Sequence, residues 1–341
     1  MEKAKLDWKN LTFGYHKTDY NIRYTWKDGK WGEGVITDDV TIPMHMAATC
    51  LHYGQEAFEG LKVFEQKNGR PVVFRVEENA RRLIRSAEKI FMAPVPEELF
   101  IDAVLAVVKA NAKYIPPYGT GAALYVRPLL IGTGPQIGVK PADEYLFIVM
   151  VTPVGPYFKT GFKPVHLIIE NEFDRAAPNG TGDIKIGGNY AAGLRASLRA
   201  KKAGYTEVLY LDAKEKRYLD ESGPANFFGI TKDGRYVTPK SPSILPSITN
   251  MSIVTIAEEL GMRPERRPVD VEEIFGFVDA GCCGTAAMIT PVGSITFGDR
   301  KAVYRKDDTP GEYCTKLFKK LTGIQYGEEP DKHGWIREIP L

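Results

Sequence analysis

Hydrophobic and polar residues follow two periods in the first half of the chain. Strict alternation, interrupted by Asp-Gly and Asn-Gly turns, predicts two β-hairpins and two later strands, over residues 22–31, 61–76, 122–131 and 145–152. Apolar residues at helical spacing predict two helices, over residues 80–91 and 97–114, each bounded by prolines. This mixture of hairpins and helices indicates an α+β domain.

A run of proline and glycine, Pro153-Val154-Gly155-Pro156-Tyr157, separates this half from the rest. We therefore expect a small α+β domain over 1–152, a linker over 153–164 and a larger domain over 165–341. Strands are predicted in the second domain at 166–170, 207–212, 226–230 and 235–238. Helices are predicted there at 190–203, 249–260, 270–277 and 309–321, the last ended by Gly323.

Composition narrows the classes of protein. The 341 residues are 43% apolar, which is enough for two packed cores, and 45 basic against 43 acidic residues leave a net charge of +2. This balance implies no nucleic-acid partner, and no apolar run is long enough for a membrane span. The four cysteines and five histidines show no metal-ligand spacing, so we expect no metal. With no signal-peptide core at the start, the expected location is cytoplasmic.

One lysine stands out from this ordinary background. Lys185 lies between Ile184 and Ile186, in a stretch from Asn179 to Tyr190 that contains four glycines. A lysine that loses hydration among apolar groups has a lowered pKa, and its neutral amine attacks carbonyl groups to form Schiff bases. The pattern favours a lysine that carries pyridoxal 5'-phosphate (PLP) as an imine. The alternative is an ordinary lysine whose stem covers apolar surface while its amine reaches water.

A PLP site also needs an acid near the pyridine nitrogen. Glu221 precedes a Gly223-Pro224 turn and the apolar strand predicted at 226–230, so it is a candidate for a carboxylate buried at the head of that strand. Such a carboxylate stays charged only beside a cation, and a partner cation is therefore expected. The alternative is a glutamate in a surface turn.

Three elements could bind the cofactor's phosphate. Leu245-Pro246-Ser247-Ile248-Thr249 leads into a predicted helix, and Gly281 to Ala287 is a loop of small residues, so both could offer free backbone N–H groups. Arg75, at the end of a predicted strand, could add a charged two-point contact. Each of these segments alone is weak evidence for a phosphate site, because loops of glycine, serine and threonine usually bind no ligand.

Taken together, these motifs resemble the class IV aminotransferases, and within them the branched-chain amino-acid aminotransferase family. The stretch from Gly182 to Tyr190 and the stretch from Glu221 to Phe228 carry the resemblance in the second half. The first half adds Leu51-His52-Tyr53, Phe58-Glu59-Gly60 and Leu124-Tyr125-Val126-Arg127-Pro128. The similarity extends from about Phe13 to the C-terminal helix.

The resemblance implies a fold type IV PLP enzyme, a homodimer whose active sites lie at the domain interface and are touched by the partner subunit. It implies that Lys185 is the imine lysine and acid/base, that Glu221 contacts the pyridine nitrogen, and that Tyr190 lies next to the cofactor's phenolic oxygen. The phosphate would be held by Arg75, Ile248, Thr249 and Thr285. Thr285 and Ala286 would bind the substrate carboxylate, and the substrate pocket would be shaped by Phe13, Tyr53, Phe58, Tyr125 and Arg127. Gly187 and Gly188 would leave room for the cofactor.

The implied reaction moves the amino group of L-leucine, L-isoleucine or L-valine to 2-oxoglutarate. Two positions depart from the family pattern. The family usually has a basic residue where this chain has Asn250, and it often has a glycine where this chain has Ser247. The Cys-x-x-Cys pair of some mammalian members is absent, since Ala287 and Thr290 occupy those positions. D-amino-acid aminotransferase, amine transaminase and aminodeoxychorismate lyase share the fold and remain alternatives, as does a non-catalytic PLP-binding module.

Overall fold

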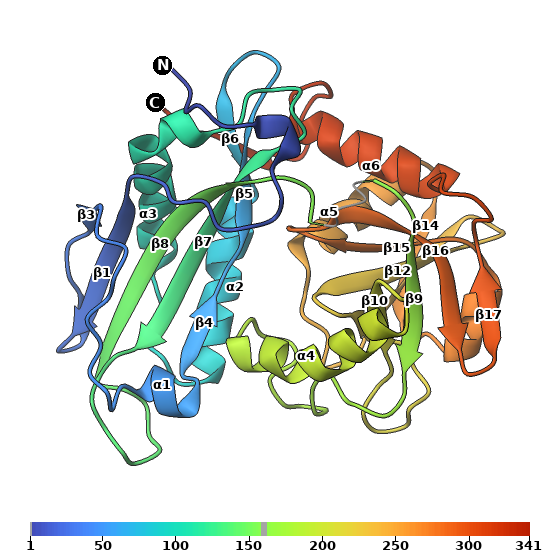
Figure 1. Ribbon diagram of the computed structural model, residues 1–341, viewed down its shortest axis with the longest axis horizontal. Helices are drawn as coiled ribbons and strands as arrows, with labels where there is room; N and C mark the ends of the chain where they lie inside the picture. The colour runs from blue at the N-terminus through green and yellow to red at the C-terminus, as the bar shows by residue number, and fades with distance from the viewer. Residues whose placement is uncertain (1, 158–161) are drawn as a thin grey trace. The chain divides into compact units, whose positions relative to one another are not determined.

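The computed structural model describes residues 2–157 and 162–341 (Figure 1). The chain divides into two compact units. Unit 1 contains Met1–Tyr157, Ile184–Gly187 and Gly323–Leu341, and unit 2 contains Phe158–Asp183 and Gly188–Thr322. The boundary after Tyr157 falls within the predicted linker, of which residues 158–161 lie outside the described part. Two short segments from the predicted large domain, one of them containing Lys185, belong to unit 1.

Unit 1 is built on an antiparallel sheet. Within the described residues it has nine strands, ordered β18-β6-β5-β7-β8-β1-β2, with β3 paired to β1 and β4 paired to β7. The strands are β1 (Asn21–Lys27), β2 (Lys30–Trp31), β3 (Val35–Thr37), β4 (Glu56–Phe58), β5 (Leu61–Glu65), β6 (Pro71–Phe74), β7 (Ala123–Gly132), β8 (Glu144–Val154) and β18 (Ile336–Glu338). Because β18 pairs with β6, the end of the chain belongs to the first sheet.

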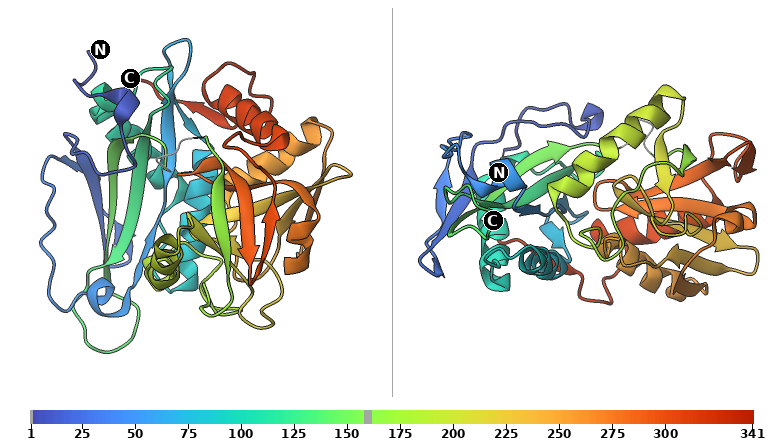
Figure 2. Two further views of the ribbon diagram at one scale, coloured as in Figure 1. Left: turned by 45° about the vertical axis from the view of Figure 1, so that its right-hand side comes forward. Right: turned by 90° about the horizontal axis from the view of Figure 1, so that it is seen from below.

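Helices cover one face of this sheet. α2 (Val76–Lys89) and α3 (Glu97–Ala110) lie together on it, as Figures 1 and 2 show, and their apolar sides pack on Val63, Leu124 and Val126. Since side chains alternate along a strand, Tyr125 and Arg127 point to the opposite face. The other helical segments in the described part of this unit are α1 (Thr49–Tyr53), η1 (Trp8–Asn10) and η2 (Ala112–Tyr114), where η marks a 3₁₀ helix.

Unit 2 contains a second sheet, in which parallel and antiparallel pairs are mixed. Within the described residues its strand order is β10-β9-β16-β15-β12-β13-β14, with β11 paired to β12 and β17 to β16. The strands are β9 (Val165–Glu170), β10 (Glu207–Tyr210), β11 (Glu221–Ser222), β12 (Ala225–Thr231), β13 (Arg235–Pro239), β14 (Arg263–Arg267), β15 (Phe277–Gly284), β16 (Met288–Phe297) and β17 (Arg300–Val303).

Among the residues that the structure describes, three α-helices and one 3₁₀ helix accompany this sheet: α4 (Gly187–Lys202), α5 (Ile248–Glu259), η3 (Val271–Phe275) and α6 (Glu312–Gln325). Ala196 and Ala200 of α4 pack on Val208 and Tyr210, while α5 contacts β14 and β15. Both units thus combine a sheet with helices, which confirms the α+β prediction. No helix in the described part of the chain is long and apolar enough to cross a membrane.

Most predicted elements are present within a few residues of their expected bounds, but three local predictions were wrong. Residues 271–275 form a 3₁₀ helix, although the predicted capping box of Asp270 and Glu273 is present. α6 begins at Glu312 and continues past Gly323 to Gln325. Residues 281–284 belong to strand β15, so the loop predicted from Gly281 to Ala287 is reduced to a turn at 285–287.

Candidate active site

The Lys185 segment is fixed to the body of unit 1. Ile184 and Ile186 are buried in its core, which accounts for the apolar residues on both sides of the lysine. The backbone N–H of Lys185 donates to Ser86 Oγ at 3.0 Å, and its carbonyl accepts from the Phe58 N–H at 3.1 Å. The Gly187 N–H donates to the Glu56 carboxylate. These bonds fix the backbone on both sides of the lysine, so its side chain starts from a defined position.

The surroundings of Lys185 favour a neutral amine. Loss of hydration lowers the pKa of Lys185 to about 8, and the positive charges of Arg82 and Arg127 act in the same direction. Glu59 and Tyr125 oppose this shift and raise the pKa. The lysine Nζ also lies 4.6 Å from the centre of the Phe58 ring. An amine with this pKa is partly neutral near pH 8, as a Schiff-base lysine requires.

Four of the predicted substrate-pocket residues are joined by contacts in unit 1. Arg127 donates to the Tyr125 hydroxyl at 3.0 Å, and its guanidinium stacks 4.8 Å from the Phe58 ring centre. Phe13 packs edge-on against Tyr125, with ring centres 5.2 Å apart. A Cβ at Gly60 would collide with the Tyr125 hydroxyl, so a glycine is required there. The group combines aromatic walls with one cation.

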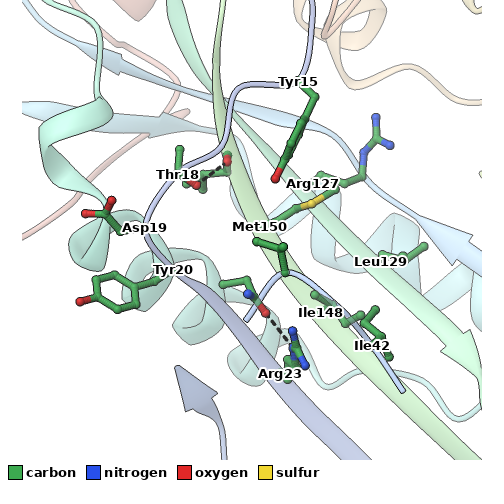
Figure 3. Close-up of a pocket in the computed structure, with 13 residues that line it drawn as sticks. Tyr15, Thr18, Asp19, Tyr20, Arg23, Ile42, Arg127, Leu129, Ile148 and Met150 are labelled. Atoms are coloured by element: carbon green, nitrogen blue, oxygen red, sulfur yellow. Dashed lines mark hydrogen bonds between the residues drawn. The ribbon is translucent and has the colours of Figure 1, made fainter. Parts of the chain in front are cut away.

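A pocket of about 150 Å³ continues along the same face of the sheet. Figure 3 shows Arg127, Leu129 and Met150 lining it together with Tyr15. Tyr53, the fifth predicted pocket residue, lies elsewhere in unit 1. It ends α1, is 43% exposed, and donates its hydroxyl to the Ile137 carbonyl.

Arg75 follows strand β6, as predicted, and stands at the N-cap of α2 with φ of 52°. A left-handed backbone is unfavourable for a non-glycine residue. The guanidinium lies 5.1 Å from the centre of the Trp335 ring, and the Arg75 N–H donates to the Trp335 carbonyl at 2.7 Å. Burial lowers the pKa of Arg75, while Glu78 raises it. The contacts with Trp335, the residue before β18, thus fix the position of Arg75.

Glu221 is buried in unit 2, with 3% of its surface exposed, as the sequence predicted. Its Oε1 accepts from the Leu245 N–H at 2.7 Å and from Asn226 Nδ2 at 2.9 Å. Its Oε2 forms an ion pair with Arg175 Nη1 at 3.2 Å. The expected partner cation is therefore supplied, at least in part, by the protein. Three donors favour the ionised carboxylate.

The N-terminus of α5 offers an anion site in unit 2. Ser247 is its N-cap, and the serine Oγ accepts from the Asn250 N–H at 3.2 Å. Within the described residues, the backbone N–H groups of Ile248 and Thr249 have no hydrogen-bond acceptor, although both residues are buried. Two free donors at a positive helix end suit a phosphate.

Asn250 points into a buried polar network that also reaches Glu221. Its Oδ1 accepts from the Tyr236 hydroxyl at 2.7 Å, and its Nδ2 donates to Asn226 Oδ1 at 3.2 Å and to Thr238 Oγ1 at 2.9 Å. Asn226 in turn donates to Glu221. The departure at Asn250 therefore links the helix N-terminus to the buried acid.

The other predicted site residues lie at the start of α4 and in a turn between two strands. Tyr190 lies in the first turn of α4 and is half-buried, and Thr285 and Ala286 form the turn between β15 and β16. Gly188 has open space where a side chain would project, which fits the room expected for a cofactor. The same expectation for Gly187 was wrong, because the Glu56 carboxylate fills that space.

Sequence reasoning missed the charged residues that support the site. Arg175 has no sequence signal, since an arginine in a loop looks like any surface residue. Glu59 lies in the Phe58-Glu59-Gly60 motif, but nothing in that motif indicates a role for its carboxylate. Arg82 and Ser86 could have been found, because positions three and seven residues after Asn79 share one face of a helix.

The chain matches the Amino-transferase class IV family over residues 56–295. The branched-chain-amino-acid aminotransferase of Haemophilus influenzae is 48% identical over 340 residues, which cover 98% of this chain and 99% of that protein.

Solved structures agree with this similarity. The branched-chain amino acid aminotransferase of Escherichia coli superposes with a TM-score of 0.81 at 28% identity, covering 95% of this chain and all of the other. The T.th. branched-chain amino acid aminotransferase with pyridoxamine 5'-phosphate gives a TM-score of 0.77 at 25% identity, covering 93% and 98% of the two chains.

Proposed function

The chain belongs to the class IV aminotransferase family, and we propose that it transfers the amino group of L-leucine, L-isoleucine or L-valine to 2-oxoglutarate. The products are the branched 2-oxo acids and L-glutamate, and the reaction is reversible. The enzyme is a PLP-dependent transferase. Lys185 carries this proposal, because its amine has a pKa of about 8 and lies beside a group of aromatic and arginine side chains.

The residues of the chain fit PLP in three chemical respects. Lys185 supplies an amine for covalent attachment to the cofactor's aldehyde. Glu221, held as a carboxylate by Arg175, suits a protonated ring nitrogen. The free N–H groups of Ile248 and Thr249, with Arg75 and Thr285, suit a phosphate dianion. When bound, PLP supplies an electron sink for the charge that develops at the substrate's Cα.

Each proposed catalytic residue has a defined task. Lys185 would act as the base that takes the proton from the substrate's Cα and as the acid that delivers it to the cofactor's C4′ carbon. Glu221 would keep a bound cofactor's ring nitrogen protonated, and the Tyr190 hydroxyl would donate to its phenolic oxygen. The backbone N–H groups of Thr285 and Ala286 bind the substrate carboxylate.

The substrate pocket has the composition that both half-reactions need. Phe13, Phe58 and Tyr125 offer apolar walls to a branched side chain. Arg127, whose buried Nε has no hydrogen-bond partner among the described residues, has a donor left for the second carboxylate of glutamate. An arginine within aromatic walls can thus accept either substrate.

We further propose a homodimer in which the active site lies at the domain interface and Tyr53 serves the partner's site. Exposed apolar residues flank the pocket of Figure 3, including Tyr15 at 66% and Val40 at 56% exposure, and a second copy would bury them. We also propose a cytoplasmic location, which agrees with four free cysteines.

Covalent attachment at Lys185 tests the proposal. Wild-type protein treated with PLP and borohydride is expected to carry the cofactor on the peptide containing Lys185, as measured by mass spectrometry. The Lys185→Ala variant is expected to lose this label and transamination of L-leucine together. Lys67→Ala, at an exposed lysine, is the matched control and is expected to retain both.

Three outcomes would contradict the assignment. A Lys185→Ala variant that still bound PLP covalently would show that another lysine reacts. Transfer from D-alanine but not from L-leucine to 2-oxoglutarate would identify a D-amino-acid aminotransferase, the main alternative of the same fold. Bound PLP without turnover of any amino donor would favour a non-catalytic module.

A further inference from the structure

A polar stripe crosses the buried face of α2. Asn79, Arg82 and Ser86 are 2%, 4% and 0% exposed, and their spacing puts them on one side of the helix. The other buried positions of this helix are mainly small or apolar, such as Ala80 and Leu83. Burying a guanidinium, an amide or a hydroxyl costs free energy unless the group has hydrogen-bond partners. The polar stripe must therefore be paired inside the core.

Glu59 is the main partner of this stripe. It is fully buried, and its two oxygens accept from Arg82 Nε at 2.7 Å and Arg82 Nη2 at 2.8 Å. Asn79 Nδ2 donates to the same carboxylate at 2.8 Å, and the Gly60 N–H donates at 3.1 Å. Burial alone would raise the pKa of Glu59, but Arg82, Lys185 and Asn79 outweigh burial and lower it. Glu59 therefore remains ionised.

Stability alone does not explain this ion pair. Two charges taken out of water lose hydration, and apolar residues of similar size often stabilise a core as well or better. The role of the Arg82–Glu59 ion pair must therefore be sought in the residues next to it.

The neighbour is Lys185. Ser86, one helical turn after Arg82, accepts the Lys185 N–H, and Phe58, next to Glu59, donates to the Lys185 carbonyl. The charged and titratable groups of unit 1 that act on the lysine amine are Glu59, Arg82, Tyr125 and Arg127. Glu56 lies nearby on β4, where it accepts from Gly187. Glu59 is thus the anion best placed to hold Lys185 in its charged form.

We propose that Arg82 is a positioning residue that holds Glu59 in a two-point ion pair and places its own positive charge beside Lys185. The charge of Arg82 then offsets that of Glu59, so the neutral amine that the cofactor and proton transfer require is favoured at Lys185. The inference rests on the proposed function, because it gives Lys185 the role of the reactive amine. Arg82 acts through Glu59 and through its own charge, and it touches neither substrate nor cofactor in this role.

The test measures the ionisation of Lys185 in cofactor-free protein. Trace acylation with acetic anhydride from about pH 6 to about pH 10, followed by peptide mass spectrometry, gives the fraction of neutral Lys185 at each pH. A lysine is charged below its pKa and neutral above it. In Arg82→Gln the midpoint is expected to move to higher pH, and reactivity at neutral pH is expected to fall about tenfold when the midpoint rises by about one pH unit.

Two further variants sharpen the result. Glu59→Gln is expected to move the midpoint to lower pH, and the double variant Glu59→Gln/Arg82→Gln is expected to return it toward the wild-type value. Arg81→Gln is the matched control, since Arg81 is the neighbouring arginine of α2 but its side chain is 52% exposed and pairs with Glu78 and Glu97. It is expected to leave the midpoint unchanged.

An unchanged midpoint in folded Arg82→Gln, verified by circular dichroism, would overturn the inference. If that variant does not fold, an unchanged midpoint in Glu59→Gln would overturn it instead. The borohydride label on wild-type Lys185 separates the two proposals: a labelled lysine with an insensitive midpoint removes only the inference, whereas an unlabelled lysine removes the proposed function.

Discussion

The protein surrounds the Glu221 carboxylate with donors that favour its charged form before any cofactor binds. Arg175, Asn226 and the Leu245 N–H all point at its carboxylate, and only 3% of its surface is exposed. A preorganised group of this kind needs no rearrangement during the reaction, which is why such contacts contribute strongly to catalysis. The residue therefore offers a sharp test of the proposed chemistry.

Glu221→Gln is expected to keep bound PLP but to lose most turnover. The amide has nearly the same shape, so α5 and its phosphate site remain, but it cannot hold a proton on the ring nitrogen. The barrier is expected to rise by about 3 kcal/mol, roughly a hundredfold in kcat. The measurement is kcat for L-leucine together with the PLP content of the purified protein.

Glu215→Gln, at an exposed glutamate of the same unit, is the control and is expected to retain wild-type turnover. A Glu221→Gln variant with unchanged kcat would remove the acid from the mechanism. Loss of PLP without loss of turnover in reconstituted protein would assign Glu221 to binding alone.

At the scale of helices and strands, the sequence pattern predicted those elements that depend on interactions between residues close together in the chain. The hairpins around Asp28-Gly29 and Asn68-Gly69 have turn residues that require no distant partner, and both are present. Strand β14 (Arg263–Arg267) was missed, because its four charged residues and one proline show no alternation of apolar and polar side chains. It forms by pairing in parallel with β13. Lys185 and the N-terminus of α5 have local signals. The ion pair between Arg175 and Glu221 joins residues that are distant in the sequence, so no local sequence pattern predicts it.

The network at α5 gives a prediction at this scale. Asn250→Leu keeps the volume of the side chain but leaves the Tyr236 hydroxyl and Asn226 Oδ1 without their partner. The free energy of unfolding is expected to fall by about 2 kcal/mol, because buried polar groups lose hydrogen bonds. PLP affinity is expected to fall with it, since Asn226 also fixes Glu221. Urea unfolding and PLP titration provide the measurements.

A double-mutant cycle separates this network from general damage. Tyr236→Phe is expected to destabilise the wild type but to have little further effect in Asn250→Leu, because the hydroxyl has already lost its partner. Additive effects of the two substitutions would contradict the network. Asn10→Leu, at an exposed asparagine, serves as the control.

At the scale of the whole molecule, the chain passes between its units in a way that concerns the site. The segment Ile184–Gly187 leaves unit 2 to pack in the core of unit 1, and the chain then returns into α4. Lys185 is therefore carried by the unit that also holds Phe58, Tyr125 and Arg127, while Glu221 and the start of α5 belong to the other. The proposed reaction needs all of these groups around one cofactor, so it depends on the assembled protein.

Tyr53 tests that assembly. Its side chain is 43% exposed and bonds to Ile137, away from the group formed by Tyr125 and Arg127, so we expect it to complete the active site of a second copy. Tyr53→Ala and Lys185→Ala are each expected to have low activity. Mixed and allowed to exchange subunits, they are expected to recover up to about a quarter of wild-type activity, because half of the dimers are hybrids with one intact site each.

The expected recovery has a specific origin. In a hybrid dimer the Lys185→Ala subunit lends its intact Tyr53 to the subunit that retains Lys185, and only that site is complete. Native mass spectrometry measures the hybrid fraction, and activity is expected to rise in proportion to it. Hybrids without recovered activity would show that Tyr53 acts within its own subunit or not at all. A protein that stays monomeric at assay concentration would exclude the homodimer itself.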